Sequence, residues 1–537
     1  MYRIVTNIPN YIICLFPLFL LLGAGITDVM LSIVSVAFLI RSAYKKDFRW
    51  IHEKWVQIAL FFWIYIMAIS FIAIDFNDAF KHGVGFIRFI FFGIALEHTL
   101  SEKPDLQKYL LIVLSIVLTF AMIDTYYQYF FDVDLFGYQK HVTNRLTGPI
   151  RHLRIGGYLH YLLYPALLVS LYFLWKKKSI FYTILGIFLM FFTIMPIILS
   201  GERVQIPLLY IGFISAGLLW KNKRKYLAMT SILVISSSIF IASFNHVTKD
   251  RIFTETAIQL NAIILYLFPN KQNEPIAEPI LTPPVQKPIA EPNITPPVQK
   301  SVAEPILTPP VQQPVTEPNI TPPVQKPIAE PTLTPPVQKP VPEPILTPPV
   351  QQPVAEPILT PPVQQPIAEP NITPPAQNQL AIENPEQINI SSQEHYIQIW
   401  TRSFKIFLEN PLLGVGIRNF QKKCVEAKYG PTDNIERRCG LHSHNFYVEL
   451  LVETGIIGVF IILILLATWI YKMIKLYPLW QNLPIQIGLV TCFIISFFPF
   501  LPTRSFFNNW RMALLWFIIG WLLASLKSLK SQDKIDK

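Results

Sequence analysis

Long apolar segments are the feature that most restricts what this chain can form. A helix that crosses a bilayer needs about 20 mostly apolar residues, and about twelve segments of roughly that kind can be placed along the chain. Their approximate bounds are 9–25, 27–41, 55–74, 84–97, 109–130, 156–175, 179–199, 204–220, 226–244, 446–470, 485–501 and 511–526. The first, second and fourth are short for a full crossing. Because backbone polar groups inside a bilayer must be bonded internally, we predict an all-α polytopic membrane protein.

Charge along the chain predicts the orientation. The net charge is +11, and only 15% of the residues are charged. Lys and Arg gather in short loops, which remain cytoplasmic in membrane proteins. These loops are "RSAYKKDFRWIHEK" (41–54), "KKK" (176–178) and "KNKRK" (221–225), together with the tail 527–537. The charges are split among loops that face lipid headgroups and form no basic domain with interleaved aromatic residues, which argues against nucleic acid as a partner.

The same topology divides the chain into six regions and places one long loop on the outer side of the membrane. The regions are 1–244 (spans one to nine, the first retained as a helix and not cleaved as a signal peptide), 245–277 (first part of the outer loop), 278–381 (repeats), 382–445 (second part of that loop), 446–526 (spans ten to twelve) and 527–537 (cytoplasmic tail). Cys424 and Cys439 lie in the loop, where an oxidising compartment permits a disulfide. Cys14 and Cys492 lie inside apolar segments and are expected to act as small hydrophobic residues.

A proline-rich repeat interrupts the outer loop. From Glu278 to Ala381 the chain holds eight 13-residue units, of which the first reads "EPILTPPVQKPIA". Frequent proline removes backbone donors and fixes φ, so neither helix nor sheet can propagate, and an extended polyproline II or coil segment is expected. We interpret it as a spacer without chemistry of its own. The alternative is a stalk that reaches into the cell envelope or binds a partner.

The stretch "LHSHNFYVELLVETGIIG" (441–458) places two histidines and an asparagine before an apolar run. Asn445 is a favoured helix N-cap. His444 would then lie at the outer mouth of the tenth span, and a neutral imidazole there can accept a proton from a hydroxyl group. The alternative is an interfacial histidine that only hydrogen-bonds a lipid headgroup.

These residues resemble the bacterial O-antigen ligase family, which shares its fold with polymerases of the Wzy type. The signature is His444-Asn445, nine residues, then Gly455-x-x-Gly458. Three further stretches resemble family segments: "ENPLLGVGIRNF" (409–420), "RLTGPIRHLRIGGYLHYLLYP" (145–165) and "LSGERVQIP" (199–207). The two glycines after the histidine are expected to allow close helix packing.

The resemblance implies a GT-C-type glycosyltransferase that works without cofactor, metal or nucleotide. It implies transfer of a glycan from undecaprenyl diphosphate to a lipid A-core hydroxyl, and an essential arginine at Arg203. An arginine at a membrane boundary is costly, so a functional role is the first interpretation, and its planar set of N–H donors suits phosphate oxygens. We therefore expect His444 as general base and Arg203 on the leaving diphosphate, with helix capping as the alternative for Arg203.

Further candidates for substrate binding lie on the same outer face. They are Arg145, Arg154, His442 and Asn445. The family usually carries a second functional arginine a few residues before the position of Trp400, where this chain has His395. Either His395 or Arg402 is expected to supply that positive charge. Arg145 and Arg154 could equally bind anionic lipid.

Other interpretations are weaker. "DVD" (132–134) has the spacing of a carboxylate pair for a metal–nucleotide complex, but it should lie outside, where nucleotide sugars are absent, and such short motifs arise by chance. No CxxC or HExxH spacing in the sequence supports zinc. The rival functions are a Wzy-type polymerase, a protein O-oligosaccharyltransferase, a transporter and an envelope interaction protein. A transporter is expected to carry its ionisable residues near the bilayer midplane, whereas here they gather at one face.

Overall fold

The computed structural model of the chain describes residues 2–141, 145–150, 155–244, 249, 395–430, 432 and 435–535. The predicted repeat segment 278–381, most of the loop 245–277 and Arg154 lie outside the described residues. Within them the structure is helical, and the only β contact is an isolated antiparallel bridge between Val133 and Gln139.

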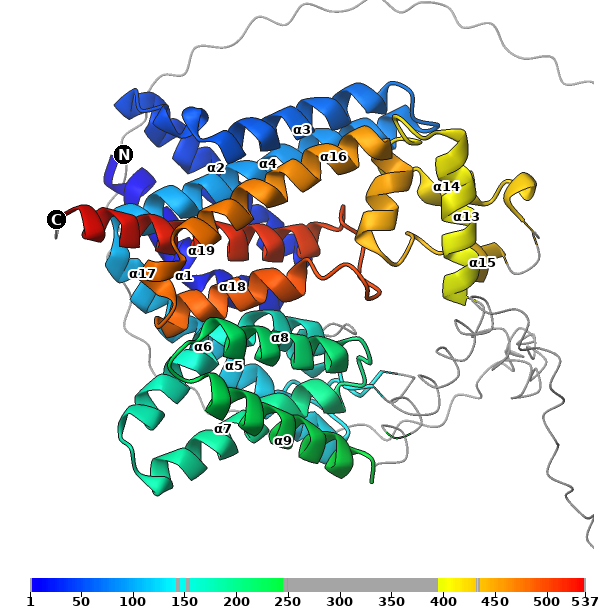
Figure 1. Cartoon of the computed structure of the whole chain (residues 1–537). Coiled ribbons are helices and arrows are strands. Elements are labelled where there is room, and N and C mark those ends of the chain that lie inside the picture. Colours follow the sequence, from blue (N-terminus) through cyan, green and yellow to red (C-terminus); the bar gives the residue numbers. More distant parts are fainter. Residues whose placement is uncertain are drawn as a thin grey trace, which may run out of the picture. The chain divides into compact units, whose positions relative to one another are not determined.

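A helix lies over each of the predicted apolar segments (Figure 1). These helices are α1 (Tyr2–Leu22), α2 (Ala24–Lys45), α3 (Lys54–Ser70), α4 (Phe76–Glu102), α5 (Pro104–Phe131), α6 (Ile155–Lys176), α7 (Ile180–Leu199), α8 (Gln205–Leu219), α9 (Arg224–Ala242), α16 (Phe446–Lys475), α18 (Pro484–Ser496) and α19 (Asn509–Ile535). Among the described residues, 8 helices are long and apolar enough to cross a membrane, and four shorter apolar helices accompany them. The chain is therefore a multi-pass membrane protein, and a total of twelve crossings stays a prediction.

Two length expectations were wrong. The second and fourth segments looked short, yet α2 has 22 residues and α4 has 27. Both helices continue past their apolar stretches into polar residues, because adding a residue to a formed helix gains a backbone hydrogen bond whatever its hydropathy. At the start of α4 the side chain of Asp75 accepts a hydrogen bond from the backbone N–H of Asp78.

Small residues let the helices approach closely at two crossings. A Cβ on Gly93 of α4 would lie 2.6 Å from Cε3 of Trp516 in α19. A Cβ on Gly488 of α18 would lie 2.6 Å from the backbone of Pro165 in α6. Helix association in a bilayer depends on such close van der Waals packing, because lipid tails are as apolar as the side chains. These two crossings hold the elements that surround the site described below.

The two ends of α16 differ in chemistry. At its C-terminal end Lys472 pairs with Glu53 at 3.0 Å, and Lys527 of α19 lies 3.9 Å from the same carboxylate. Glu53 belongs to the basic turn between α2 and α3. At its N-terminal end α16 begins after Asn445. The basic turn and the histidine motif thus lie at opposite ends of one helix, as the charge pattern predicts.

α16 is broken at Gly455, where φ is 64° and ψ is −175°. The loop "NPLLGVG" (410–416) fills the break: Pro411 O accepts from Ile456 N at 2.9 Å, and Gly416 N donates to Glu453 O at 3.0 Å. A Cβ on Gly455 would lie 2.2 Å from Leu412 O. The expectation of helix–helix packing at this glycine was wrong, because a loop backbone occupies the space that a second helix would need.

A small helical lobe precedes α16. It consists of α13 (His395–Glu409), α14 (Phe420–Cys424), a 3-10 turn (Ala427–Tyr429) and α15 (Ile435–Cys439). Ile399, Ile406, Phe420 and Tyr429 form part of its own apolar core. In Figure 1 the lobe lies beside the first turns of α16, and α13 runs across the axis of that helix.

Candidate active site

Asn445 starts α16 and fixes the segment that carries His444. Its side-chain oxygen accepts from the N–H groups of Tyr447 and Val448 at 3.0 and 3.3 Å. Its Nδ2 donates to Pro499 O at 2.9 Å. The predicted N-cap is therefore confirmed. These bonds use the side chain, so Asn445 acts here through the helix and its neighbouring loop, and it does not line the cavity that the described residues form.

His444 is held in a left-handed backbone conformation with φ of 52°. Non-glycine residues rarely adopt this region, and strained residues of this kind gather at functional sites. Thr503 N donates to His444 O at 2.7 Å, and Trp400 Nε1 donates to the preceding carbonyl of Ser443 at 2.9 Å. The ring of Tyr396 packs edge-on against the imidazole at 5.2 Å between centroids. Contacts from α13 and from the loop before α19 thus determine where the imidazole lies.

A cavity of about 370 Å³ joins this imidazole to distant parts of the chain. Its walls come from the segment before α6 and the start of that helix, the α7–α8 turn, α13, the His444 segment, the α18–α19 loop and the start of α19. Its principal polar lining residues are Arg145, Tyr161, Glu202, Arg203, Gln205, Tyr396, His442, His444, Thr503, Arg504 and Arg511. The structure therefore brings together four predicted site residues, namely His444, Arg203, Arg145 and His442.

Two further arginines in the wall were not singled out from the sequence. Arg504 lies in the loop between α18 and α19, and Arg511 lies in the first turns of α19. Arg511 Nη2 donates to Ser496 O at 2.9 Å, and its guanidinium lies 4.3 Å from the centroid of the Tyr161 ring. The signal was present in "LPTRSFFNNWRM" (501–512): one arginine just before the last apolar segment and one at its start are unusual on the side predicted to be outer, where basic residues are rare.

Glu202 places a carboxylate among these cations. Burial raises the pKa of this carboxyl, and Arg504 and Arg145 act in the opposite direction. It lies against the first turn of α6, where Cβ atoms on Gly156 and Gly157 would come within 3.2 Å of its Cδ and 3.4 Å of its Oε2. Negative charge is stabilised at a helix N-terminus. Glu202 therefore lies between the arginines and the start of α6, where its side chain fills the space beside Gly156 and Gly157.

A chain of hydrogen bonds leads from Glu202 into the helix bundle. Gln205 Nε2 donates to Glu202 Oε2 at 3.3 Å, and Gln205 Oε1 lies 2.8 Å from Nδ1 of the fully buried His160. Nε2 of His160 is 2.9 Å from the hydroxyl of Tyr164. Since the amide oxygen can only accept, His160 donates from Nδ1 and accepts at Nε2. The stretch "GGYLHYLLYP" thus supplies the polar support behind the cavity wall.

His442 lines the cavity beside His444. Its Nε2 lies 3.3 Å from Thr503 O, a carbonyl that can only accept, so Nε2 carries the hydrogen. Burial, helped by Arg504 and Arg418 and opposed by the bond to Thr503 O, lowers the pKa of His442 to about 4. His442 is therefore neutral near pH 7.

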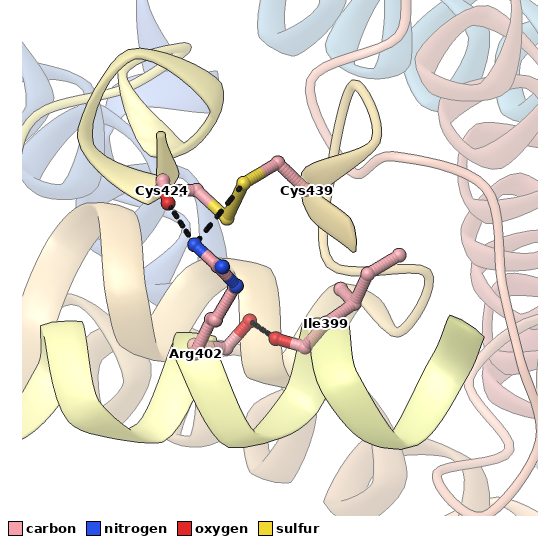
Figure 2. Close-up of a disulfide and its surroundings, with 5 residues drawn as sticks. Ile399, Arg402, Cys424 and Cys439 are labelled. Atoms are coloured by element: carbon pink, nitrogen blue, oxygen red, sulfur yellow. Dashed lines mark hydrogen bonds between the residues drawn. A yellow bond between two sulfur atoms is a disulfide. The ribbon is translucent and has the colours of Figure 1, made fainter. Parts of the chain in front are cut away.

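Arg402, one of the two residues expected to supply the second positive charge, is not among the residues that line the cavity. Its side chain is buried, with Nη1 donating to Cys424 O at 2.7 Å and lying 3.8 Å from Cys439 Sγ (Figure 2). Cys424 and Cys439 form the disulfide expected from the sequence, with their Cα atoms 5.6 Å apart. A buried guanidinium needs bonded partners, and here they include a carbonyl and a disulfide sulfur. His395 is the first residue of α13.

The "DVD" motif has a local structural role. Asp134 Oδ1 accepts from Phe136 N at 2.9 Å and from Tyr138 N at 2.8 Å, which closes the turn after α5. Leu135 N donates to Asp124 at 2.8 Å. These bonds account for the carboxylate in the turn without a metal–nucleotide ligand.

Comparison with known proteins gives one family. Residues 376–463 match the Wzy_C family model, described as O-antigen ligase. No curated protein matches the chain. The matched residues include α13, the disulfide, the His444 segment and the Gly455 break. The resemblance inferred from the sequence is confirmed over this segment, which lies within a multi-pass helical membrane protein.

Proposed function

We propose that the protein is an O-antigen ligase, which transfers a glycan from undecaprenyl diphosphate to a lipid A-core hydroxyl at the periplasmic face of the inner membrane. The observation that carries the proposal is that one cavity is lined both by His444 and by the four arginines Arg145, Arg203, Arg504 and Arg511. The family match and the helical membrane architecture support the same class of enzyme.

The arginines suit the leaving group. As the glycosidic bond breaks, negative charge develops on the diphosphate, and cations fixed in place beforehand stabilise it without rearranging. Guanidinium groups offer paired donors to phosphate oxygens and keep their charge even where burial disfavours it. Burial lowers the pKa of Arg504, and Glu202 opposes this shift. The carboxylate thus helps to retain the cationic cluster while no substrate is present.

His444 suits the acceptor. The imidazole takes the proton of the acceptor hydroxyl as that oxygen forms a bond to the anomeric carbon. The bond from the same carbon to the phosphate oxygen breaks, and its electron pair leaves with undecaprenyl diphosphate. Attack from the face opposite the leaving group inverts the anomeric centre. The proton ends on His444, and the reaction as proposed needs no metal or other cofactor.

A transfer assay with purified lipid-linked glycan and lipid A-core tests the chemistry. General base catalysis contributes about 10²- to 10⁴-fold, so His444→Ala should lose that factor while the glycan remains on its carrier. His52→Ala is the matched control, because His52 is exposed in the basic turn at the other end of the bundle. Full transfer by His444→Ala would reject the assignment.

The acceptor is tested separately in a deletion strain. Bare core together with polymeric, carrier-linked glycan indicates a ligase. Core that bears a single repeat unit indicates the Wzy-type polymerase, in which the acceptor is a growing lipid-linked glycan. Intact lipopolysaccharide with loss of glycan from serine or threonine residues indicates protein O-oligosaccharyl transfer.

A further inference from the structure

α13 has an apolar face that the described part of the chain leaves uncovered. Phe404 and Leu408, on successive turns, are 50% and 72% exposed. Ile399 and Ile406, on another face of the same helix, are fully buried in the core of the lobe. An exposed apolar face on a helix that already has a buried one needs a second apolar environment.

A polar edge borders the uncovered face on one side. Lys405 Nζ donates to Tyr429 O at 3.3 Å, and Glu409 pairs with Lys428 at 2.6 Å. The helix therefore carries a buried strip, a charged strip and an exposed apolar strip. This is the arrangement of an amphipathic helix that lies in a membrane interface.

The apolar strip continues into a surface that faces lipid. Leu412, which follows α13, is 62% exposed, and its carbonyl accepts from Ile457 N in α16. On α16, Ile456 and Phe460 are 51% and 63% exposed. α16 is one of the helices long and apolar enough to span the membrane, so its exposed apolar side chains contact lipid. The strip on α13 and this surface meet at Leu412.

The turn between α3 and α4 marks the height of the interface. A turn that joins two apolar helices lies at the bilayer boundary, and here it exposes Phe71 and Ile74. The loop before α14 is tied to this turn, because Asp75 N donates to Asn419 Oδ1 at 2.9 Å and Lys422 pairs with the Asp75 carboxylate. The lobe is thus fastened at the height at which apolar side chains leave the bilayer.

We propose that α13 lies in the membrane interface at the cavity end of the spans, with Phe404, Leu408 and Leu412 among the lipid chains just below the headgroups. Its course across the axis of α16 agrees with a helix parallel to the membrane plane (Figure 1). The same helix supplies Trp400, which bonds the carbonyl of Ser443 beside His444. The lipid surface therefore sets the height of His444 above the bilayer.

Spin-label accessibility tests the proposal on the full chain in phospholipid nanodiscs. Single cysteines replace Leu408 and, as a matched control on the same helix, Lys405, in a background with Cys14→Ala and Cys492→Ala that keeps the disulfide. A nitroxide at Phe460→Cys gives the lipid standard. The collision rates with oxygen, which partitions into lipid, and with a nickel chelate, which stays in water, are measured at each site.

The expected result is that the Leu408 label collides more with oxygen than with nickel, like the Phe460 label, whereas the Lys405 label collides more with nickel. A Leu408 label as accessible to nickel as the Lys405 label would overturn the proposal. So would a Leu408 label shielded from both reagents, which would indicate cover by protein. Neither result bears on glycan transfer, so this proposal can fail while the proposed function stands.

Discussion

The ring centroid of His442 lies 4.3 Å from that of His444, so two imidazoles share one wall of the cavity. They differ in bonding: Nε2 of His442 is occupied by Thr503 O, and burial lowers the pKa of His442 to about 4. A second imidazolium beside His444 would repel the proton that His444 is proposed to accept. The neutral His442 avoids that repulsion.

The lowered pKa of His442 predicts a pH-dependent stability. The ordinary histidine pKa is about 6.5, so between pH 6.5 and about 4 the unfolded chain binds a proton that the folded chain does not. The neutral, buried His442 therefore costs no stability above pH 6.5. The free energy of unfolding decreases as the pH falls from 6.5 to about 4, because protons bind preferentially to the unfolded chain. We expect His442→Asn, which cannot titrate, to lose less thermal stability than the wild type between pH 7 and pH 4.5.

Thermal unfolding in detergent at the two pH values gives the measurement, and His52→Asn is the control, because His52 is exposed. Equal losses in His442→Asn and the wild type would contradict the assigned shift.

Arg504 is predicted to bind the donor. Hydrogen bonds to charged groups contribute about 1.5–3 kcal/mol, which corresponds to roughly 10- to 100-fold. We expect Arg504→Ala to lower kcat/KM for the lipid diphosphate donor by such a factor, and Arg504→Lys to recover part of it because the charge returns without the fork. Arg49→Ala in the exposed turn after α2 serves as control. A donor KM and kcat unchanged in Arg504→Ala would remove this residue from the site.

The sequence predicts those parts of the molecule that depend on local pattern. Apolar runs locate the helices, the residue type of Asn445 predicts the cap, and the charge bias predicts that Arg203 and His444 share one face. The two residues do line one cavity. Such features follow from hydropathy and from short-range hydrogen bonding, both of which can be read from neighbouring residues.

The parts that sequence reasoning missed depend on tertiary contacts. Arg504 lies in the site because its neighbour Thr503 is bonded to the His444 segment: Thr503 N donates to His444 O, and Thr503 Oγ1 accepts from Phe446 N. These two segments are far apart in the chain. The position of Arg402 beside the carbonyl of Cys424 could not be predicted, because the charge of a side chain does not show whether it faces a cavity or a buried carbonyl. Gly455 was misassigned because the loop that fills its helix break lies about forty residues upstream of it and carries no complementary pattern.

Gly455 is predicted to be intolerant of a side chain. Its φ of 64° and ψ of −175° lie in a region essentially confined to glycine and cost another residue roughly 1–3 kcal/mol, and a Cβ would also lie 2.2 Å from Leu412 O. We expect Gly455→Ala to lower thermal stability and the yield of folded protein. Gly85→Ala is the matched control, because Gly85 lies inside α4 and a Cβ added there would meet no other atom within 4 Å. A Gly455→Ala protein as stable as Gly85→Ala would mean that the α16 break is not required.

The disulfide between Cys424 and Cys439 is predicted to stabilise the lobe that positions His444. The bond closes a loop with a sequence separation of 15, which in the chain-entropy model contributes about 3 kcal/mol. Loss of the disulfide also frees the segment of Cys424, whose carbonyl accepts a hydrogen bond from Arg402 of α13. α13 is then held less firmly, and its Trp400 donates to the carbonyl of Ser443 beside His444. We therefore expect the double variant Cys424→Ser, Cys439→Ser to be cut by protease within residues 395–440 much faster than the wild type, and to transfer glycan more slowly. Cys14→Ser, at a free thiol in α1, should behave as the wild type in both assays. If the double variant resists protease as the wild type does, the lobe is held by its apolar core and the disulfide adds little to it.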